Sequence, residues 1–188
     1  MKLTNSRFKN NSAEGGTGYE NGQGKGGAIF VQEGATAFAE GSLIFGTAAN
    51  STQNSATDAE IDNPTDNKDV YGIIKPIVSI NVSGSPAEEG EKAATFTISR
   101  ATSSEPHTLT FVVEGNATFE EDYEVKTDKT VTYTFSQNMG TVEIPANTNE
   151  ETKIVFTITP VDDEIDDPNE NIQLTLNKGT GYEVSEAA

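Results

Sequence analysis

Seven short stretches between residues 77 and 176 alternate apolar and polar residues, and this alternation constrains the fold more than any other feature of the sequence. Phe96 and Ile98 fall on one face of an extended strand, while Thr95, Thr97 and Ser99 fall on the other. The alternating stretches cover 77–82, 94–100, 109–113, 130–135, 140–144, 153–159 and 172–176. Separated by turns and rich in β-branched residues, they predict an antiparallel β-sandwich. Its expected core comprises Val78, Ile80, Phe96, Ile98, Leu109, Phe111, Ile144, Ile154, Phe156, Ile158, Leu174 and Leu176.

The first 72 residues have a different pattern, in which short apolar units are separated by glycine and asparagine. The units lie at 7–13, 26–31 and 45–51, a spacing of about 20 residues. Glycine permits the positive φ of tight corners, and asparagine can hydrogen-bond its own backbone at a turn. This pattern favours two or three stacked β-coils, with a disordered leader as the alternative. We expect a loop over residues 50–69 and a linker at residues 73–76.

The charge of the chain narrows the choice of partners. The formal net charge is −18, and residues 76–188 hold 21 acidic and 6 basic residues, or −15. A surface this acidic repels phosphate backbones, so no nucleic acid is expected as a partner. It suits solubility, salt tolerance or divalent cations, which net charge alone does not separate. The chain has no cysteine, which excludes disulfides and thiolate metal sites.

Export signals and membrane segments are not evident in the sequence. No apolar run is long enough to cross a bilayer, so no membrane segment is expected. The first residues lack the apolar core of a secretory signal. We therefore interpret the chain as a fragment of a longer exported protein.

Two short motifs in the first segment have counterparts in a known family. Phe8 and Asn11 form an FxxN motif, residues 26–29 read GGAI, and residues 45–50 repeat the first motif imperfectly. These motifs resemble those of polymorphic outer-membrane proteins and related surface β-helices. The resemblance implies that residues 1–72 are the last coils of a right-handed parallel β-helix.

A series of motifs in the second segment has a family resemblance of its own. The matching pieces are residues 89–90, 96–100, 114–117 with 122–123, 142–146, and 158–164 running into 169–176. In order and spacing they are similar to the Calx-β family over about 110 residues. The resemblance implies that residues 77–188 form an immunoglobulin-like β-sandwich. The expected architecture is thus all-β, with a β-helix-like domain at 1–72, a linker at 73–76 and a Calx-β sandwich at 77–188.

Residues 162–170 contain six carboxylates and no basic residue. Carboxylates this close repel one another, and Ca²⁺ suits such a site because it accepts six to eight oxygen ligands. In the Calx-β family the corresponding loop supplies calcium ligands. The resemblance therefore implies a weak Ca²⁺ site, with a solvated acidic turn as the alternative. The candidate ligands are Glu89, Glu114, Asp162, Asp163, Asp167 and Glu170.

These inferences favour a non-catalytic, calcium-binding structural or adhesion module. Its parent would be a large bacterial protein, secreted or displayed at the cell surface in association with the outer membrane. The alternative is a fragment of a β-helix carbohydrate-active enzyme with an accessory Calx-β domain. The only histidine, His107, is expected in a polar surface turn without a functional role. The chain stops before the family's last strand, so strand 172–176 is expected to leave an unpaired sheet edge for neighbouring domains or other chains.

Overall fold

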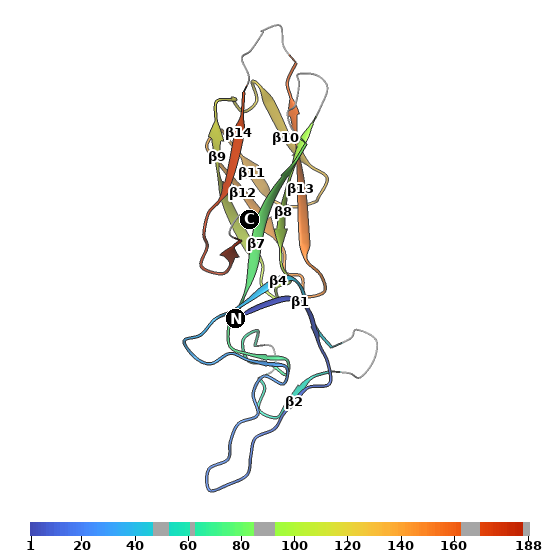
Figure 1. Ribbon diagram of the computed structural model, residues 1–188, viewed down its shortest axis with the longest axis vertical. Helices are drawn as coiled ribbons and strands as arrows, with labels where there is room; N and C mark the ends of the chain where they lie inside the picture. Colours follow the sequence, from blue (N-terminus) through green and yellow to red (C-terminus); the bar gives the residue numbers. More distant parts are fainter. Residues whose placement is uncertain (47–52, 61–62, 85–92, 163–169, 186–188) are drawn as a thin grey trace. The chain divides into compact units, whose positions relative to one another are not determined.

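The computed structural model describes residues 1–46, 53–60, 63–84, 93–162 and 170–185 (Figure 1). All regular elements in these ranges are β-strands, arranged in mixed and antiparallel sheets, which confirms the all-β prediction. The chain divides into two compact units. The first comprises Met1–Ile77, Ala101–Ser104 and Ala146–Glu151, and the second comprises Val78–Arg100, Glu105–Pro145 and Thr152–Ala188.

Parallel strand pairs build the first unit. β1 (Lys2–Phe8) pairs with β4 (Ala37–Phe45), and residues 37–39 of β4 pair with the first residues of β7 (Ile74–Ser83). β2 (Ser12–Ala13) pairs with β5 (Ser55–Ala56), and β3 (Ile29–Phe30) pairs with β6 (Val70–Tyr71). The chain thus passes twice through the same order of three strands. We call β1–β3 the first coil and β4–β6 the second coil.

The distance in sequence between stacked strands differs from the predicted one. Lys2 lies beside Phe38, Ser12 beside Ser55 and Ile29 beside Val70, which are separations of 36, 43 and 41 residues. The predicted spacing of about 20 residues is wrong, because the units at 7–13 and 26–31 lie within one coil.

Residues 50–69 also differ from the predicted loop, because they contain β5. The sequence 54–56 repeats the Asn-Ser-Ala of residues 11–13 and stacks directly on it. The imperfect repeat at 45–50 was therefore only half right: Phe45 stacks on Phe8, but the residue that meets Asn11 is Asn54. The residues interpreted as a linker include the start of β7, since Ile74 pairs with Ala37.

Left-handed backbone positions mark the corners of both coils. Asn5 has a φ of 43° and Gly41, at the corresponding place in the second coil, has a φ of 68°. The register of β1 and β4 shifts at this point, and the backbone N–H of Ser42 donates to Asn5 Oδ1 at 3.1 Å. Asparagine and glycine tolerate this conformation better than other residues, which explains their abundance in the segment. The coils enclose a small core of Ile29, Val31, Ala37, Ala39, Leu43 and Ala101.

Two antiparallel sheets build the second unit (Figure 1). The first has the order β7-β8-β13-β10, and the second has the order β11-β12-β9-β14. A short strand, β15 (Glu183–Val184), pairs with β7. The other strands are β8 (Ala94–Arg100), β9 (His107–Gly115), β10 (Tyr123–Thr127), β11 (Tyr133–Phe135), β12 (Met139–Ile144), β13 (Thr152–Pro160) and β14 (Ile172–Leu176).

The two sheets share one hydrophobic core. Phe96, from β8, stacks on Phe156 at a centroid distance of 4.8 Å and meets Phe111 of the opposite sheet edge-on. All of the predicted core residues are buried except Ile80 and Leu174, which are half-buried against the same cluster. Alternation therefore identified the core correctly, because one face of every strand points into it. The unpredicted strand β10 adds Tyr123 and Val125.

Candidate functional site

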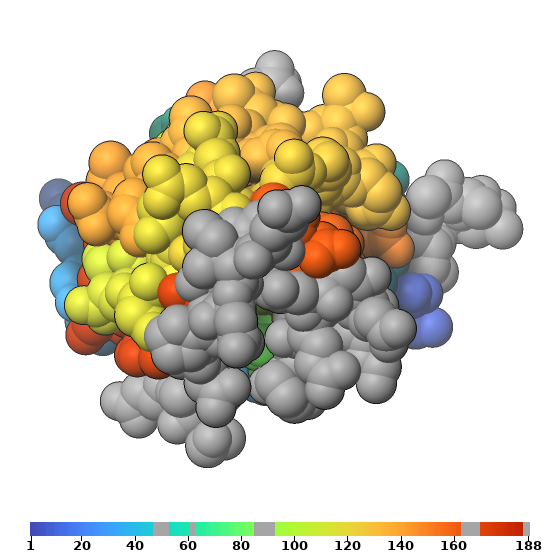
Figure 2. All heavy atoms as spheres, turned by 90° about the horizontal axis from the view of Figure 1, so that it is seen from above, coloured from blue at the N-terminus to red at the C-terminus, as the bar shows by residue number. Residues whose placement is uncertain are grey.

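The strand register brings three acid-bearing connections to one end of the second unit. These connections are residues 84–93 between β7 and β8, 116–122 between β9 and β10, and 161–171 between β13 and β14. Figure 2 looks onto this end of the unit. The pairs that define the end are Ser83 with Thr95, Ala94 with Ile158, Tyr123 with Pro160, and Gly115 with Ile172.

Half of the expected calcium ligands lie in the described residues. Glu114 stands near the end of β9 opposite Gln173, Asp162 follows β13, and Glu170 precedes β14. All three are exposed to solvent. The other three, Glu89, Asp163 and Asp167, lie outside the described residues. Within the described ranges, no three acidic or histidine side chains are gathered closely enough to hold a metal ion.

Hydrogen bonds tie the described parts of these connections together. The backbone N–H of Asn171 donates to Asn116 Oδ1 at 2.8 Å, and the N–H of Val161 donates to the Asp122 carbonyl oxygen at 2.9 Å. Connection 116–122 is thus bonded to both ends of connection 161–171. The acids of these segments consequently start from fixed points on the sheets.

Asp122 is a further acid at this end that the sequence did not single out as a ligand. One of its carboxylate oxygens accepts a hydrogen bond from the backbone N–H of Thr118, which closes the turn before β10. Its side chain is half-exposed. The sequence signal was present, since residues 120–122 are consecutive acids just before the strand. Together with Asp162, it gives this end carboxylate oxygens, the ligand type that Ca²⁺ prefers.

A second polar cluster surrounds Arg100, which is fully buried in the second unit. Its Nη2 donates to the Pro145 carbonyl oxygen at 2.9 Å, and its Nη1 donates to the Glu105 carbonyl oxygen at 3.1 Å. Nη1 also lies 3.3 Å from His107 Nδ1. The second ring nitrogen of His107, Nε2, lies 3.1 Å from the Gly181 carbonyl oxygen. The prediction of a surface turn at His107 is wrong, because this residue begins β9 and is half-buried.

The hydrogen bonds of His107 determine its protonation. A guanidinium only donates, so Nδ1 must accept from Arg100 and Nε2 must carry the proton that is donated to Gly181. This arrangement requires the neutral imidazole. Burial lowers the pKa of His107, and the hydrogen bond to Gly181 opposes part of that shift. Burial also lowers the pKa of the Arg100 guanidinium.

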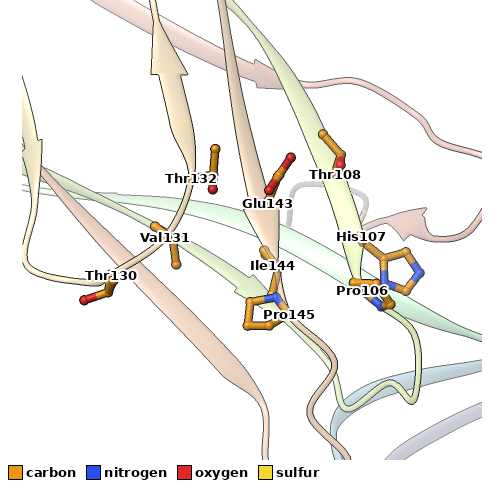
Figure 3. A pocket seen from close by; sticks show the side chains of 9 residues that line it. All are labelled: Pro106, His107, Thr108, Thr130, Val131, Thr132, Glu143, Ile144 and Pro145. Atoms are coloured by element: carbon orange, nitrogen blue, oxygen red, sulfur yellow. The ribbon is translucent and has the colours of Figure 1, made fainter.

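A shallow cavity of about 490 Å³ opens beside this cluster (Figure 3). Figure 3 shows the side chains of Thr108, Thr132 and Glu143 on the same side of the strands, while the His107 ring points away from Glu143. Both ring nitrogens of His107 face Arg100 and Gly181, so the imidazole is not positioned to act as a base with Glu143. The lining comprises Pro106, His107, Thr108, Thr130, Val131, Thr132, Glu143, Ile144 and Pro145.

Comparison with known proteins adds no assignment to these sites. No protein-family model matches the sequence, and no curated protein matches it. Within the described ranges, no helix is long and apolar enough to cross a membrane. The acidic end and the Arg100 cluster are therefore weighed by their own geometry.

Proposed function

We propose that this chain is a non-catalytic, calcium-binding structural and adhesion module. Its parent would be a large bacterial protein that is secreted or held at the cell surface. The observation that carries the proposal is the register, which places the three acid-bearing connections at one end of the second unit. Acids from different loops can then share one cation, whereas acids spread along one strand could not.

Electrostatics favours a cation at this end. Glu114, Asp122, Asp162 and Glu170 are all exposed or half-exposed, so their carboxylates can reach a shared ion without a large desolvation cost. With Glu89, Asp163 and Asp167 from the adjoining segments, the candidate ligand set is large enough for Ca²⁺. We expect a dissociation constant of roughly 10⁻⁴–10⁻³ M, the range of extracellular modules.

The strand order supports a Calx-β-like, immunoglobulin-like sandwich for the second unit. The order β7-β8-β13-β10 corresponds to the A-B-E-D sheet of immunoglobulin-like domains, and β9 paired with β14 corresponds to strands C and F. The parallel pairs of the first unit likewise support the last coils of a right-handed β-helix. A coil stack followed by a sandwich would serve as a spacer at a cell surface.

The proposal is non-catalytic because the buried polar cluster has a structural arrangement. Both nitrogens of His107 and both terminal nitrogens of Arg100 are directed at protein groups that hold β8, β9 and the segment before β15 together. Such groups are occupied in the folded state and have no geometry for proton transfer to a substrate. Partners would instead meet a sheet edge. In the part of the chain that the structure describes, β14 pairs only with β9, so its other edge can accept a strand from a neighbouring domain or another chain.

Thermal melting tests the calcium site. The wild-type protein is melted in millimolar CaCl₂ and in NaCl of equal ionic strength, and the same is done for Asp162→Asn with Asp163→Asn. Asp128→Asn with Glu143→Gln removes the same charge away from the acidic end and serves as the matched control. We expect Ca²⁺ to raise the melting temperature of the wild type and the control but not of the loop variant. At a hundredfold excess over the dissociation constant, the gain is about 2.7 kcal/mol. An equal calcium effect in all three proteins would assign these acids to a solvated turn.

A further inference from the structure

The first coil has an open edge along all three of its strands. Among the described residues, β1, β2 and β3 each pair with one strand of the second coil and with no strand on the opposite side. We call this side the open coil edge. It consists of unpaired backbone groups together with the side chains that stack between coils.

Aromatic stacking is one feature of the interface between the two coils. Phe8 stacks on Phe45 with a centroid distance of 5.6 Å, and Phe30 stacks on Tyr71 with a centroid distance of 5.0 Å and an angle of 13°. Each aromatic ring of the first coil therefore covers one ring of the second. Phe30 nevertheless remains 60% exposed, an unusual exposure for a phenylalanine in a regular strand pair.

An asparagine pair is the second feature of that interface. Asn54 Oδ1 accepts hydrogen bonds from the backbone N–H of Asn11 at 3.1 Å and from Asn11 Nδ2 at 2.9 Å. Asn54 Nδ2 donates to the Phe8 carbonyl oxygen at 3.2 Å. Asn54 is buried by these contacts, whereas Asn11, its counterpart one coil earlier, is exposed. The same residue type thus occupies a covered position in one coil and an uncovered position in the other.

We propose that the open coil edge docks one further parallel β-coil, which continues the three ladders. The docked coil places an aromatic residue over Phe8, a second aromatic residue over Phe30 and an asparagine bonded to Asn11. The inference concerns the first unit only and is independent of the calcium proposal. It follows from continuity with the interface between the first and second coils, where these same pairings are formed.

Charge distinguishes this occupant from a second copy of the chain. The β1 strand carries Lys2 and Arg7 and no acid. Its present neighbour β4 supplies Glu40, whose Oε1 lies 2.7 Å from Lys2 Nζ. Two β1 strands from two copies would bring like charges together, which destabilises a strand pair. A coil with an acid across from Lys2 would be accepted, as β4 is.

The test is a covalent probe coil. A copy of residues 1–36 is placed directly before Met1, because 36 residues separate Lys2 from its partner Phe38. Hydrogen exchange then reports on β1 of the original chain. We expect the amides of β1 to be protected roughly tenfold or more relative to the unextended protein. A control copy carrying Phe8→Ser, Asn11→Ser and Phe30→Ser has the same length, and we expect it to leave the exchange unchanged.

Cross-linking gives a second readout that does not depend on exchange. The chain has no cysteine, and Ser12 Oγ lies 3.2 Å from Ser55 Oγ, so Ser12→Cys with Ser55→Cys calibrates disulfide formation between stacked coils. Ser12→Cys in both the probe and the original chain should form an intramolecular disulfide at a similar rate. Unprotected β1 amides without a cross-link would overturn the proposal. So would a concentration-dependent dimer of the unextended chain in which β1 is protected.

Discussion

Arg100 illustrates how a single charged residue can organise a core. The side chain is fully buried, and the described groups around it are carbonyl oxygens and the imidazole of His107. Hydrogen bonds from a charged donor contribute about 1.5–3 kcal/mol each when their partners are well placed. The guanidinium therefore joins β8 to the chain segments before β9 and after β12, where no strand pairing is available.

His107 should make stability depend on pH. Its folded-state pKa is lowered, so the neutral form is favoured by folding. This contribution is present above the unfolded pKa of about 6.5 and is lost as pH falls below that value through the folded pKa. We expect the free energy of unfolding in urea to fall more between pH 8 and pH 5 in the wild type than in His107→Gln. A loss of the same size in both proteins would show that His107 stays uncoupled from folding.

Asn54 should be the most sensitive polar position of the first unit. Asn54→Ala removes the partners of the Asn11 N–H and the Phe8 carbonyl oxygen. Leaving such groups without partners costs about 1–3 kcal/mol. We expect this loss in urea unfolding of the first unit, whereas Gln53→Ala, an exposed neighbour, should change the free energy by less than about 0.5 kcal/mol. Equal effects at the two positions would contradict the role of Asn54 in the stack.

At the scale of elements, close packing across strands sets the limits on substitution. Gly140 on β12 is buried, and a Cβ atom there would clash with the ring of Phe111 on β9. We therefore expect Gly140→Ala to destabilise the protein by about 1–3 kcal/mol through overpacking. Gly16→Ala is the control, because a Cβ there meets nothing within 4 Å. Thermal melting compares the two, and a tolerated Gly140→Ala would mean that the β9–β12 contact is loosely packed.

The sequence predicted strands well where one face is buried and the other is wet. β8 and β13 alternate cleanly, so their bounds and core residues followed from the pattern. β10 was missed, because a strand of five residues containing Glu124 and Lys126 has little apolar signal. The coil period was missed for another reason. The segments between stacked strands differ in length from coil to coil, so the Asn-Ser-Ala repeat does not recur at one fixed spacing.

The acidic site was predictable only in part. The concentration of acids at 162–170 is visible in the sequence, as is Glu114. Which of them meet depends on register, and no local pattern specifies that β9 ends beside the start of β14. Asp122 escaped notice for the same reason, since its neighbour in space is Val161.

At the scale of the whole molecule, the two units should differ in autonomy. The first unit includes Ala101–Ser104 and Ala146–Glu151, which are supplied by later parts of the chain. Leu43 N–H donates to Thr102 Oγ1 at 2.8 Å, and the Glu151 N–H donates to Ser42 Oγ at 3.1 Å. We expect residues 77–188 alone to give a dispersed amide NMR spectrum and residues 1–77 alone to give a collapsed one. A dispersed spectrum from residues 1–77 would show that the coils need no such support.

The most direct test of the central claim is a calcium titration of the full chain followed by amide NMR. If the acidic end binds Ca²⁺, saturable shifts should concentrate in residues 84–93, 116–122 and 161–171, with a common midpoint of roughly 10⁻⁴–10⁻³ M. Amides around Arg100 and in the first unit should stay in place. Shifts that are small, unsaturable and spread over all exposed acids would contradict the account and leave this end of the unit as a solvated acidic surface.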